Sequence, residues 1–492
     1  MANAKVRGFR LWITWLVGFE CLFSLALLLA FALGDADVAA SSWIYLDGVT
    51  VLMLPLVSFV GLVVSQYSIR YLDGEASQGR YFRWLGFTIG AVSWMVISGN
   101  LLQFFVAWVA TSSGLHQLLM HYRERTPARR AAWTKFAISR LGDLFIIGAL
   151  ILTFQAFGTW ELSQVFAQAR ELSETSPDSG SYALIGWLLA LGAITKSAQF
   201  PFHFWLPETM ETPTPVSALM HAGIVNAGGF LIIRMSPLMA LAPSALVALA
   251  LIGGFTACFA GVVMMTQSSI KRSLAYSTIA QMGFMMLQCG LGAFPAAMLH
   301  IVAHSLYKAH AFLGSGSVLN QASGTKGAAW PRLSWRAGAA CWLGAAIASA
   351  LSIYGTSASL GLDLTAKPGA PVLIVILGLA LTTWSWRCFS NGDLRSVAAG
   401  AAGIVGFCLA YLGSYLLFEK LLASTTVVVA FSPTQQLFWV VPFMLFIGLF
   451  WLHAKLAAQQ TPDWIRGFRV HAANGFYVDG LCRRAVRSLV GN

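Results

Sequence analysis

The chain has 492 residues, of which 57% are hydrophobic and only 10% are charged, and its formal net charge is +12. These proportions exclude an ordinary soluble globular protein. Apolar runs of roughly 20 residues, the length that a helix needs to cross a bilayer, recur from one end of the chain to the other. The short alternating segments typical of a transmembrane barrel do not occur, so we expect an all-α polytopic membrane protein.

The apolar runs predict about fourteen transmembrane helices. In chain order they lie near residues 11–33, 48–69, 84–98, 100–120, 132–155, 183–203, 214–235, 241–265, 268–290, 295–320, 337–356, 369–386, 396–418 and 434–454. The first run follows a basic stretch, but it is too long for a signal peptide and no cleavage site of small residues follows it. We therefore interpret it as the first membrane span.

Basic residues gather in alternate loops between these spans. They are Lys5, Arg7 and Arg10; Arg70, Arg80 and Arg83; Arg123, Arg125, Arg129, Arg130 and Lys135; Lys271 and Arg272; Lys326, Arg332 and Arg336; Arg387 and Arg395; and Lys455 with the arginines of the tail. The longest of the opposite loops, 156–182, is acidic instead. The positive-inside rule then places both termini in the cytoplasm, and it explains the net charge without a nucleic-acid partner.

Seven cysteines are scattered along the chain without a CxxC pair. Their spacing suits neither a metal site nor a haem or iron–sulfur signature, and no GxGxxG or Walker loop occurs. The sequence therefore predicts no cofactor in this chain and no enzymatic chemistry of its own. The cysteines fit the role of small apolar packing residues.

A few ionisable residues remain inside the predicted spans, where a charge costs ~2.5–3.5 kcal/mol and usually has a partner or a function. The main candidates are Asp143, Lys196, His221, His300, His304 and Lys308, with Glu20 and Glu419 as further candidates. Glu208, which lies between two predicted spans, is a further candidate as well. Glu20 and Glu419 have no evident local partner. Glu419 adjoins Lys420 near a span end, which favours a location at the membrane interface.

Lys196 lies near the centre of its span, and prolines follow it. They are Pro201, Pro207, Pro213 and Pro215. Because proline removes a backbone donor and clashes with the preceding turn, the helix should break just after Lys196, over about 196–213. Discontinuous helices mark ion sites in transporters. Lys196 is therefore either a proton carrier or one half of a permanent ion pair, and Asp143 on the preceding helix is the expected counter-charge.

His300, His304 and Lys308 follow one another at four-residue intervals. Helical geometry places them on one face, about 6 Å apart per step. Histidine titrates near neutrality, so such a ladder could pass protons through intervening water. The alternative is that these are satisfied core residues. We expect His221 to bridge between Lys196 and the ladder.

Several segments resemble the signature of the proton-translocating antiporter-like subunits of respiratory complex I and of multi-subunit cation/proton antiporters. The segments are LDGVTVLML (46–54), SRLGDLF (139–145), TKSAQFPFHFWLPETMETPTPVSALMHAG (195–223), TQSSIKRSLAYSTIAQMGFMML (266–287) and HIVAHSLYKAHAFLGSGSV (300–318). The resemblance runs from about residue 46 to residue 320. It implies that Lys196 is the central proton carrier, and it matches His221, His300, His304 and Lys308 to titratable residues of the family.

The chain departs from that family at two places. Val109 follows Trp108 where the family has a glutamate paired with the broken-helix lysine, so Asp143 must serve as the partner if any residue does. The segment 335–355 contains no lysine or glutamate, whereas the family has a second broken helix with one of these residues there. These departures, and the tail HAANGFYVDGLCRRAV, resemble a smaller branch, the DabB-type membrane subunits of DAB energy-coupled inorganic carbon accumulation complexes.

This second resemblance implies a cation-conducting membrane subunit in the bacterial inner membrane, with the proton as the expected ion and sodium as the alternative. It also implies a large soluble DabA-like partner with a zinc site akin to that of β-carbonic anhydrase, which ion entry drives to convert CO2 to bicarbonate. One rival is a subunit of an NADH-quinone oxidoreductase or a cation/proton antiporter. Another is a non-conducting membrane anchor for a soluble enzyme.

Together these observations divide the chain into four parts. They are an N-terminal span (1–45), a proton-translocating antiporter-like core (46–320), divergent C-terminal helices (321–455) and a cytoplasmic or interfacial tail (456–492).

Overall fold

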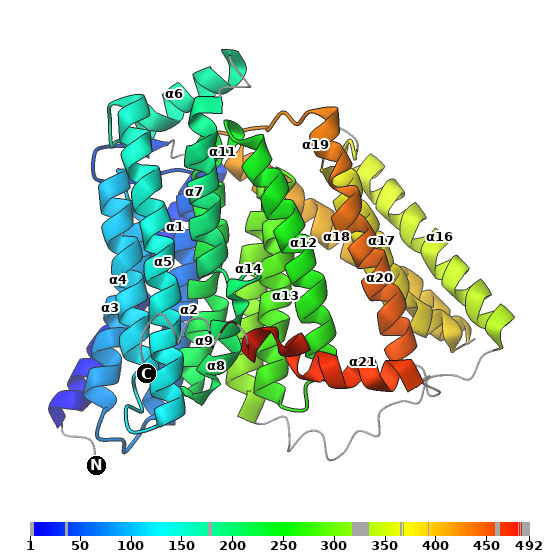
Figure 1. Ribbon diagram of the computed structural model, residues 1–492, viewed down its shortest axis with the longest axis horizontal. Helices are drawn as coiled ribbons and strands as arrows, with labels where there is room; N and C mark the ends of the chain where they lie inside the picture. Colours follow the sequence, from blue (N-terminus) through cyan, green and yellow to red (C-terminus); the bar gives the residue numbers. More distant parts are fainter. Residues whose placement is uncertain are drawn as a thin grey trace.

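The protein is almost entirely helical in the computed structural model. The structure describes residues 4–34, 38–175, 180–316, 334–364, 369–391, 393–457 and 463–480, together with Lys367, Cys482 and Arg484. The helices stand side by side in a bundle, and the start of α1 and helix α21 lie at the same end of it, which we call the termini end (Figure 1). In the described part of the chain, the strands are two short antiparallel segments, β1 (Ala39–Ala40) and β2 (Tyr45–Leu46). The predicted all-α membrane fold is confirmed.

The helices follow one another in four groups. The first comprises α1 (Ala4–Leu33), α2 (Gly48–Tyr71), α3 (Gln78–Ile97), α4 (Leu101–Leu119), α5 (Thr126–Phe157) and α6 (Leu162–Thr175). The second comprises α7 (Gly180–Lys196), η1 (Phe202–Phe204), α8 (Trp205–Glu208), η2 (Thr209–Glu211), α9 (Thr214–Ala222), η3 (Ile224–Asn226), α10 (Ala227–Arg234) and α11 (Ser236–Ala240). The third comprises α12 (Pro243–Thr266), α13 (Ile270–Gly290), α14 (Phe294–Leu313) and η4 (Gly314–Gly316). The fourth comprises α16 (Trp335–Ser359), α17 (Ala370–Ser390), α18 (Leu394–Leu422), α19 (Pro433–Leu437), α20 (Val440–Ala457), α21 (Asp463–Ala473) and η5 (Gly475–Tyr477).

Each predicted span coincides with one of these helices, except that 214–235 covers the pair α9 and α10 and 434–454 covers the pair α19 and α20. The span 183–203 runs past the end of α7 into the break that follows it. Within the described residues, nine helical segments are long and apolar enough to cross a membrane by length and composition. The predicted number of about fourteen is consistent with this finding but is not confirmed by it. The predicted loop 156–182 contains α6, which lies across the end opposite the termini (Figure 1).

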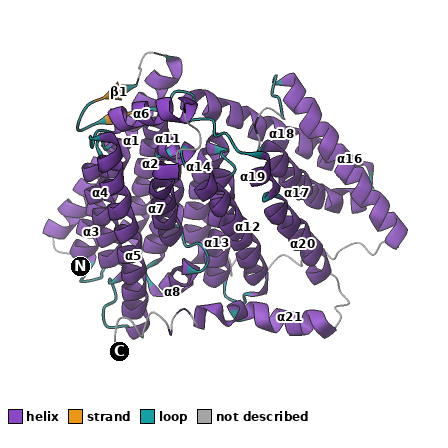
Figure 2. Cartoon of the chain, turned by 45° about the horizontal axis from the view of Figure 1, so that its top comes forward, coloured by secondary structure: helices purple, strands orange, loops and turns teal. Residues whose placement is uncertain are grey.

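Two cores hold the bundle together. The larger one joins helices from α1 to α14 with parts of α18 and α20. The smaller one lies among α16, α17 and α18 and consists of Ile353, Leu381, Ile404 and Cys408. Figure 2 shows these C-terminal helices at one side of the bundle.

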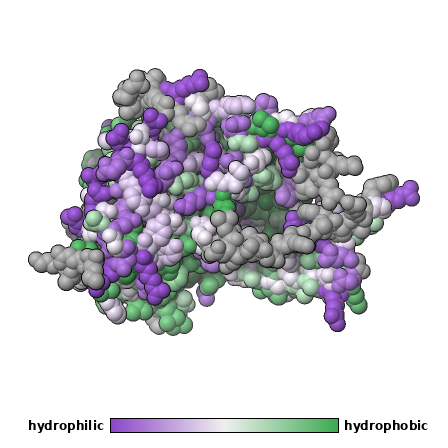
Figure 3. Space-filling model, turned by 90° about the horizontal axis from the view of Figure 1, so that it is seen from below, coloured by the Kyte–Doolittle hydropathy of each residue, from purple (hydrophilic) through white to green (hydrophobic). Residues whose placement is uncertain are grey.

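The termini end of the bundle is basic, as the loop charges predict. The loops that join α2 to α3, α4 to α5 and α12 to α13 lie there (Figure 1), and Figure 3, which views this end, shows hydrophilic residues gathered on it. Arg10 of α1 reaches Asp73 at 3.0 Å, and its hydrogen bond holds the pKa of this carboxyl below its usual range. Lys326 and Arg332 lie outside the described residues, as do the side chains of Lys5 and Lys455.

The prediction that Lys135 belongs to a basic loop is wrong. The structure places it within α5, which begins at Thr126, and its side chain is 2% exposed. Pro127 occupies the first turn of α5, where a missing N–H costs nothing. The helix therefore starts earlier than hydropathy alone suggests and carries Lys135 into the bundle.

Glycines allow α12 and α13 to pack with their backbones in contact. A Cβ added at Gly283 of α13 would lie 2.5 Å from the backbone nitrogen of Ala257 of α12. We expect Gly283→Ala to force the two helices apart and to lower the free energy of unfolding by about 1–3 kcal/mol, as overpacking does. Thermal unfolding of the purified protein in detergent measures this loss.

Gly406 of α18 is the matched control, because nothing lies within 4 Å of a Cβ added there. Alanine stabilises a helix interior by roughly 0.5–1 kcal/mol relative to glycine, so Gly406→Ala should melt at or above the wild-type temperature. Equal melting temperatures for both variants would contradict the proposed close packing.

Candidate functional site

The break in the membrane helix occurs directly after Lys196, as the prolines predict. Helix α7 ends at Lys196, and the following residues form turns and the short helices η1, α8 and η2. Ser197 ties the two sides of the break together. Its hydroxyl donates to the carbonyl of Val225 at 2.6 Å and accepts from the amide of Gly228 at 3.1 Å. The predicted broken helix is thereby confirmed.

A second break, which the sequence pattern did not predict, lies at η3 between α9 and α10. It is held by Asn226, whose Nδ2 donates to the carbonyl of Ala222 at 2.9 Å and to Ser305 Oγ of α14 at 2.9 Å. The two breaks therefore lie next to each other, joined by the hydrogen bonds between Ser197 and the segment 224–228.

Trp108 of α4 contacts the ammonium group of Lys196. Lys196 is 5% exposed, and its Nζ lies 4.3 Å from the centroid of the Trp108 ring and 3.5 Å from the Trp108 carbonyl oxygen. A cation over an indole face is attracted by its quadrupole. Within the described residues no carboxylate lies at ion-pair distance from Lys196.

Asp143 of α5 is linked to Lys196 by this tryptophan. Trp108 Nε1 donates to Asp143 Oδ1 at 2.9 Å, and Asp143 Oδ2 lies 2.7 Å from Nη2 of Arg140. The ion-pair partner of Asp143 in the structure is thus Arg140, one turn away on the same helix. A modulating effect of Asp143 on the protonation of Lys196 stays a prediction.

Lys135 is a second buried lysine in this part of the bundle. Its Nζ donates to Ser112 Oγ of α4 at 2.8 Å and to the Ser112 carbonyl at 3.0 Å. Ser112 lies one turn beyond Trp108 on α4. Lys135 and Lys196 therefore both contact α4. On this helix Val109, rather than a carboxylate, follows Trp108. The signal in the sequence is Pro127, which favours a helix start at Thr126 and so places Lys135 within α5 and inside the bundle.

The ladder on α14 contacts two neighbouring helices. The rings of His300 and His304 lie 5.9 Å apart, and His304 Nε2 lies 3.2 Å from the carbonyl oxygen of His221 of α9. Lys308 Nζ donates to Ser277 Oγ of α13 at 2.6 Å and to the Leu274 carbonyl at 3.3 Å. His304 and Lys308 thus lie next to backbone and hydroxyl oxygens, which are groups that water can bridge, whereas the contacts of His300 are with the rings of Phe284 and His304.

His221 lies beside the ladder rather than beside Lys196. It is fully buried, its Nδ1 lies 3.0 Å from Thr278 Oγ1, and its ring stacks on Phe312 at 4.3 Å. Its Nε2 has no hydrogen-bond partner among the described residues. The structure brings His221, His304 and Lys308 together, and it separates this group from Lys196 by the two helix breaks.

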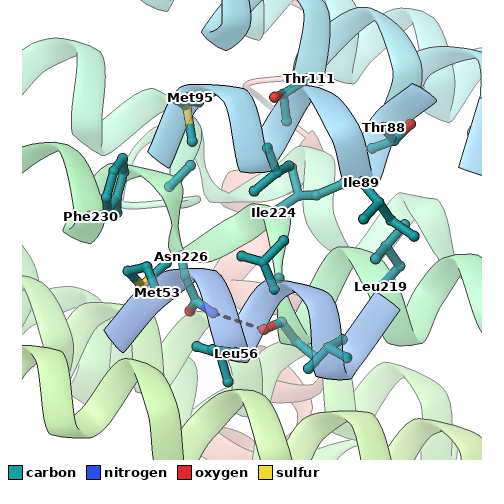
Figure 4. A pocket seen from close by; sticks show the side chains of 16 residues that line it. Met53, Leu56, Thr88, Ile89, Met95, Thr111, Leu219, Ile224, Asn226 and Phe230 are labelled. Atoms are coloured by element: carbon teal, nitrogen blue, oxygen red, sulfur yellow. Dashed lines mark hydrogen bonds between the residues drawn. The ribbon is translucent and has the colours of Figure 1, made fainter. Parts of the chain in front are cut away.

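A small cavity lies beside the second break, between α2, α3 and α4 on one side and α9 and α10 on the other. Its volume is about 30 Å³, enough for about one water molecule. Figure 4 shows that its lining is mostly apolar. The Asn226 amide on its wall donates to the Ala222 carbonyl. None of the predicted ion-carrying side chains lines it, so it is not a channel between them.

The three further candidates lie on separate helices. Glu20 of α1 accepts a hydrogen bond from Ser93 of α3. Glu208 ends α8 and is half-buried. Glu419 of α18 pairs with Lys367 and lines a cavity of about 530 Å³ between α14 and the C-terminal helices. Glu419 therefore has a partner that the sequence did not reveal, because Lys367 is distant along the chain.

A buried ion pair at the end opposite the termini was also not anticipated. Arg234, at the end of α10, is 1% exposed, and its Nη1 lies 2.6 Å from Asp47 Oδ1. Its Nη2 donates to Thr50 Oγ1 at 2.7 Å and to the Val96 carbonyl at 3.0 Å. The pair ties the second half of the broken segment to α2 and α3.

Comparison with known proteins identifies the family. A family model described as "NADH:quinone oxidoreductase/Mrp antiporter, TM" matches residues 98–351, and one described as "NADH-Ubiquinone oxidoreductase (complex I), chain 5 N-terminus" matches residues 33–82. Among solved structures, the Mrp complex from Dietzia sp. matches with a TM-score of 0.63 and 24% identity over 95% of this chain and 56% of that one. At that identity the likeness shows the fold alone.

Two curated relatives match over most of their own length. The "Probable inorganic carbon transporter subunit DabB2" of Halothiobacillus neapolitanus is 40% identical over 90% of this chain and 79% of the relative. The "Probable inorganic carbon transporter subunit DabB" of Hydrogenovibrio crunogenus is 35% identical over 89% of this chain and 82% of the relative. The chain therefore belongs to the DabB inorganic carbon transporter subunits, within the NADH:quinone oxidoreductase/Mrp antiporter family of membrane subunits.

Proposed function

We propose that this chain is the cation-conducting membrane subunit of an inorganic carbon uptake complex and that the conducted ion is the proton. Ion entry drives a soluble zinc-containing partner of the carbonic anhydrase type, which carries out the carbon chemistry. The observation that carries the proposal is Lys196, a lysine buried at a helix break with no carboxylate in contact among the described residues. Such a lysine is free to exchange its proton, and a broken helix at membrane depth is tolerated where it lines a path for water.

The proposed route starts at the end opposite the termini. Protons reach Lys196, with Asp143 acting on it through Trp108, then pass by His221 to His304 and Lys308. They leave at the termini end. The contact of His304 with the His221 carbonyl and the bond of Lys308 to Ser277 support the second half of this route. Water that enters transiently must connect Lys196 to His221.

The basic termini end supports an orientation with both termini in the cytoplasm of a bacterial cell. The partner then docks on the same end, where the hydrophilic surface of Figure 3 lies. In this orientation protons run inward, which is the direction in which a bacterial membrane potential drives them.

The ladder provides a specific test of the route. We expect Lys308→Met to lower proton flux through the reconstituted complex at least about tenfold, the effect of about 1.4 kcal/mol on a barrier. Methionine keeps the length of the side chain but cannot carry a proton. A pH-sensitive dye inside proteoliposomes reports the flux.

Lys420→Met is the matched control, since Lys420 is exposed near the end of α18. It should conduct at the wild-type rate. Equal flux through the Lys308 and Lys420 variants would remove Lys308 from the route.

The partner is tested by affinity purification of the tagged chain from its native membranes, followed by identification of the proteins and metals that come with it. A single large zinc-containing protein is the expected result. A flavin- and iron–sulfur-bearing assembly would instead assign the chain to respiration. Recovery of the chain without any partner would contradict the proposed coupling.

A further inference from the structure

The C-terminal segment folds back beneath the bundle and reaches the broken helix. Helix α21 runs along the termini end, below α12 and α13 (red in Figure 1). Gln267, at the end of α12, donates to the carbonyl of Ala473 at 3.1 Å. Phe476 then packs on Phe259 of α12, with ring centroids 5.8 Å apart. The segment is thus docked on the helices next to the break.

A tight reversal of the backbone delivers the next residues into the bundle. Gly475, Phe476 and Tyr477 have φ values of +60°, +50° and +63°. Residues other than glycine rarely adopt this backbone conformation. It costs about 1–3 kcal/mol per residue and persists only where the surrounding structure enforces it. Two successive non-glycine residues in this conformation show that packing holds the segment in a specific place.

The residue that this reversal buries is a carboxylate. Asp479 is 7% exposed, and its Oδ2 accepts a hydrogen bond from Tyr276 of α13 at 2.7 Å. Its Oδ1 lies 3.2 Å from Nε2 of His203. Burying a carboxylate costs several kcal/mol unless it is paired, so a terminal segment that carries one inward needs these two partners.

His203 belongs to the broken-helix segment itself. It lies on η1, seven residues after Lys196, and is fully buried between Phe200 and Phe259. Neither of its ring nitrogens has a hydrogen-bond partner among the described residues, so the contact with Asp479 is an ion-pair distance without hydrogen-bond geometry. A carboxylate at ion-pair distance from one ring nitrogen attracts a protonated imidazole, and the second nitrogen remains to accept or release a proton.

We infer that His203 and Asp479 form a proton-exchange site at the termini end of the broken helix, in which His203 carries the proton and Asp479 positions it. The inference rests on the proposed function, since a proton must cross this end of the bundle. Tyr276 and Arg272 of α13 and Cys482 of the tail are the other titratable or charged groups near this pair. The site makes the C-terminal segment part of the conducting machinery rather than a docking surface alone.

The test measures proton flux through the full complex in proteoliposomes with a pH-sensitive dye inside. Asp479→Asn, which keeps the size and removes the charge, should lower the flux about tenfold, and Asp479→Glu should restore most of it. Asp463→Asn is the matched control, because Asp463 is exposed on α21 and pairs only locally with Arg466. It should conduct like the wild type.

A double variant separates positioning from mere docking of the tail. If Asp479 acts through His203, adding Asp479→Asn to His203→Gln should cause no further loss of flux, since interacting residues are non-additive. Additive losses would overturn the inference. If Asp479→Asn is not recovered as an assembled complex, His203→Gln alone decides, and undiminished flux through it would overturn the inference.

These results are distinguishable from a failure of the proposed function. Normal flux in Asp479→Asn with none in Lys196→Ala would overturn the exchange site and leave the conducting role of the chain intact. A wild-type complex that carries no flux would overturn both.

Discussion

Replacement of Lys196 by alanine is expected to reduce inorganic carbon uptake to the background of cells that lack the complex, a loss of at least about tenfold. The buried ammonium over Trp108 is the group on which the proposed route depends. Uptake of labelled bicarbonate and CO2 by cells grown at low CO2 measures the effect. Co-purification of the partner should be unchanged, because Lys196 lies inside the bundle and away from its surface.

Lys196→Arg separates proton exchange from a structural charge. Arginine keeps the positive charge and the attraction to the indole ring but is not deprotonated in proteins. We expect this variant to assemble and to be as inactive as the alanine variant. Uptake by Lys196→Arg at the wild-type level would mean that a permanent cation is sufficient and that Lys196 holds helices together.

Breaking the buried ion pair of Arg234 and Asp47 is expected to lower the free energy of unfolding more than any other substitution considered. Arg234→Met leaves the Asp47 carboxylate without its cation at a site where both side chains are 1% exposed. Removal of one member of a buried pair typically costs about 3–5 kcal/mol. Thermal unfolding of the purified protein in detergent should show a large loss, or the variant should fail to accumulate in the membrane.

Two companion variants make this result specific. Asp47→Asn combined with Arg234→Met should be less harmful than Arg234→Met alone, because no unpaired charge remains. Arg466→Met, at an exposed arginine of α21, should change stability by no more than about 0.5 kcal/mol. A wild-type melting temperature for Arg234→Met would contradict the structural role of the pair.

The order of the spans and the first helix break could be predicted because they depend on local features of the chain. Hydropathy sets the spans, and the prolines after Lys196 end α7 where expected. The break at η3 could not be predicted in this way. Its segment, Ile224–Asn226, contains no proline, and the bond from Asn226 to Ser305 of α14 stabilises it only after the helices have packed.

In the candidate site, too, features within one helix could be predicted and contacts between helices could not. Residues on one helix, such as His300, His304 and Lys308, could be grouped from their spacing alone. Contacts between helices could not, which is why Trp108 was not expected to stand between Lys196 and Asp143. The pairing of Asp479 with His203 joins residues far apart in the chain, and no periodic pattern connects them.

The structure shows what surrounds Lys196 in a chain that has Val109 at the position where the family has a glutamate. In place of a carboxylate, Lys196 has an aromatic ring and a carbonyl oxygen as neighbours. A cation–π contact stabilises a charge by about 2 kcal/mol or more when desolvated, less than a close ion pair can. Lys196 is therefore held by a weaker attraction than the ion pair that a glutamate at this position would provide.

The most direct test of the conducting role is ion flux through the purified complex in proteoliposomes under an imposed membrane potential. The wild-type complex should change the internal pH, with or without sodium present, and the complex with Lys196→Arg should not. A wild-type complex that moves neither protons nor sodium, or a Lys196→Arg complex that moves protons at the wild-type rate, would contradict the account.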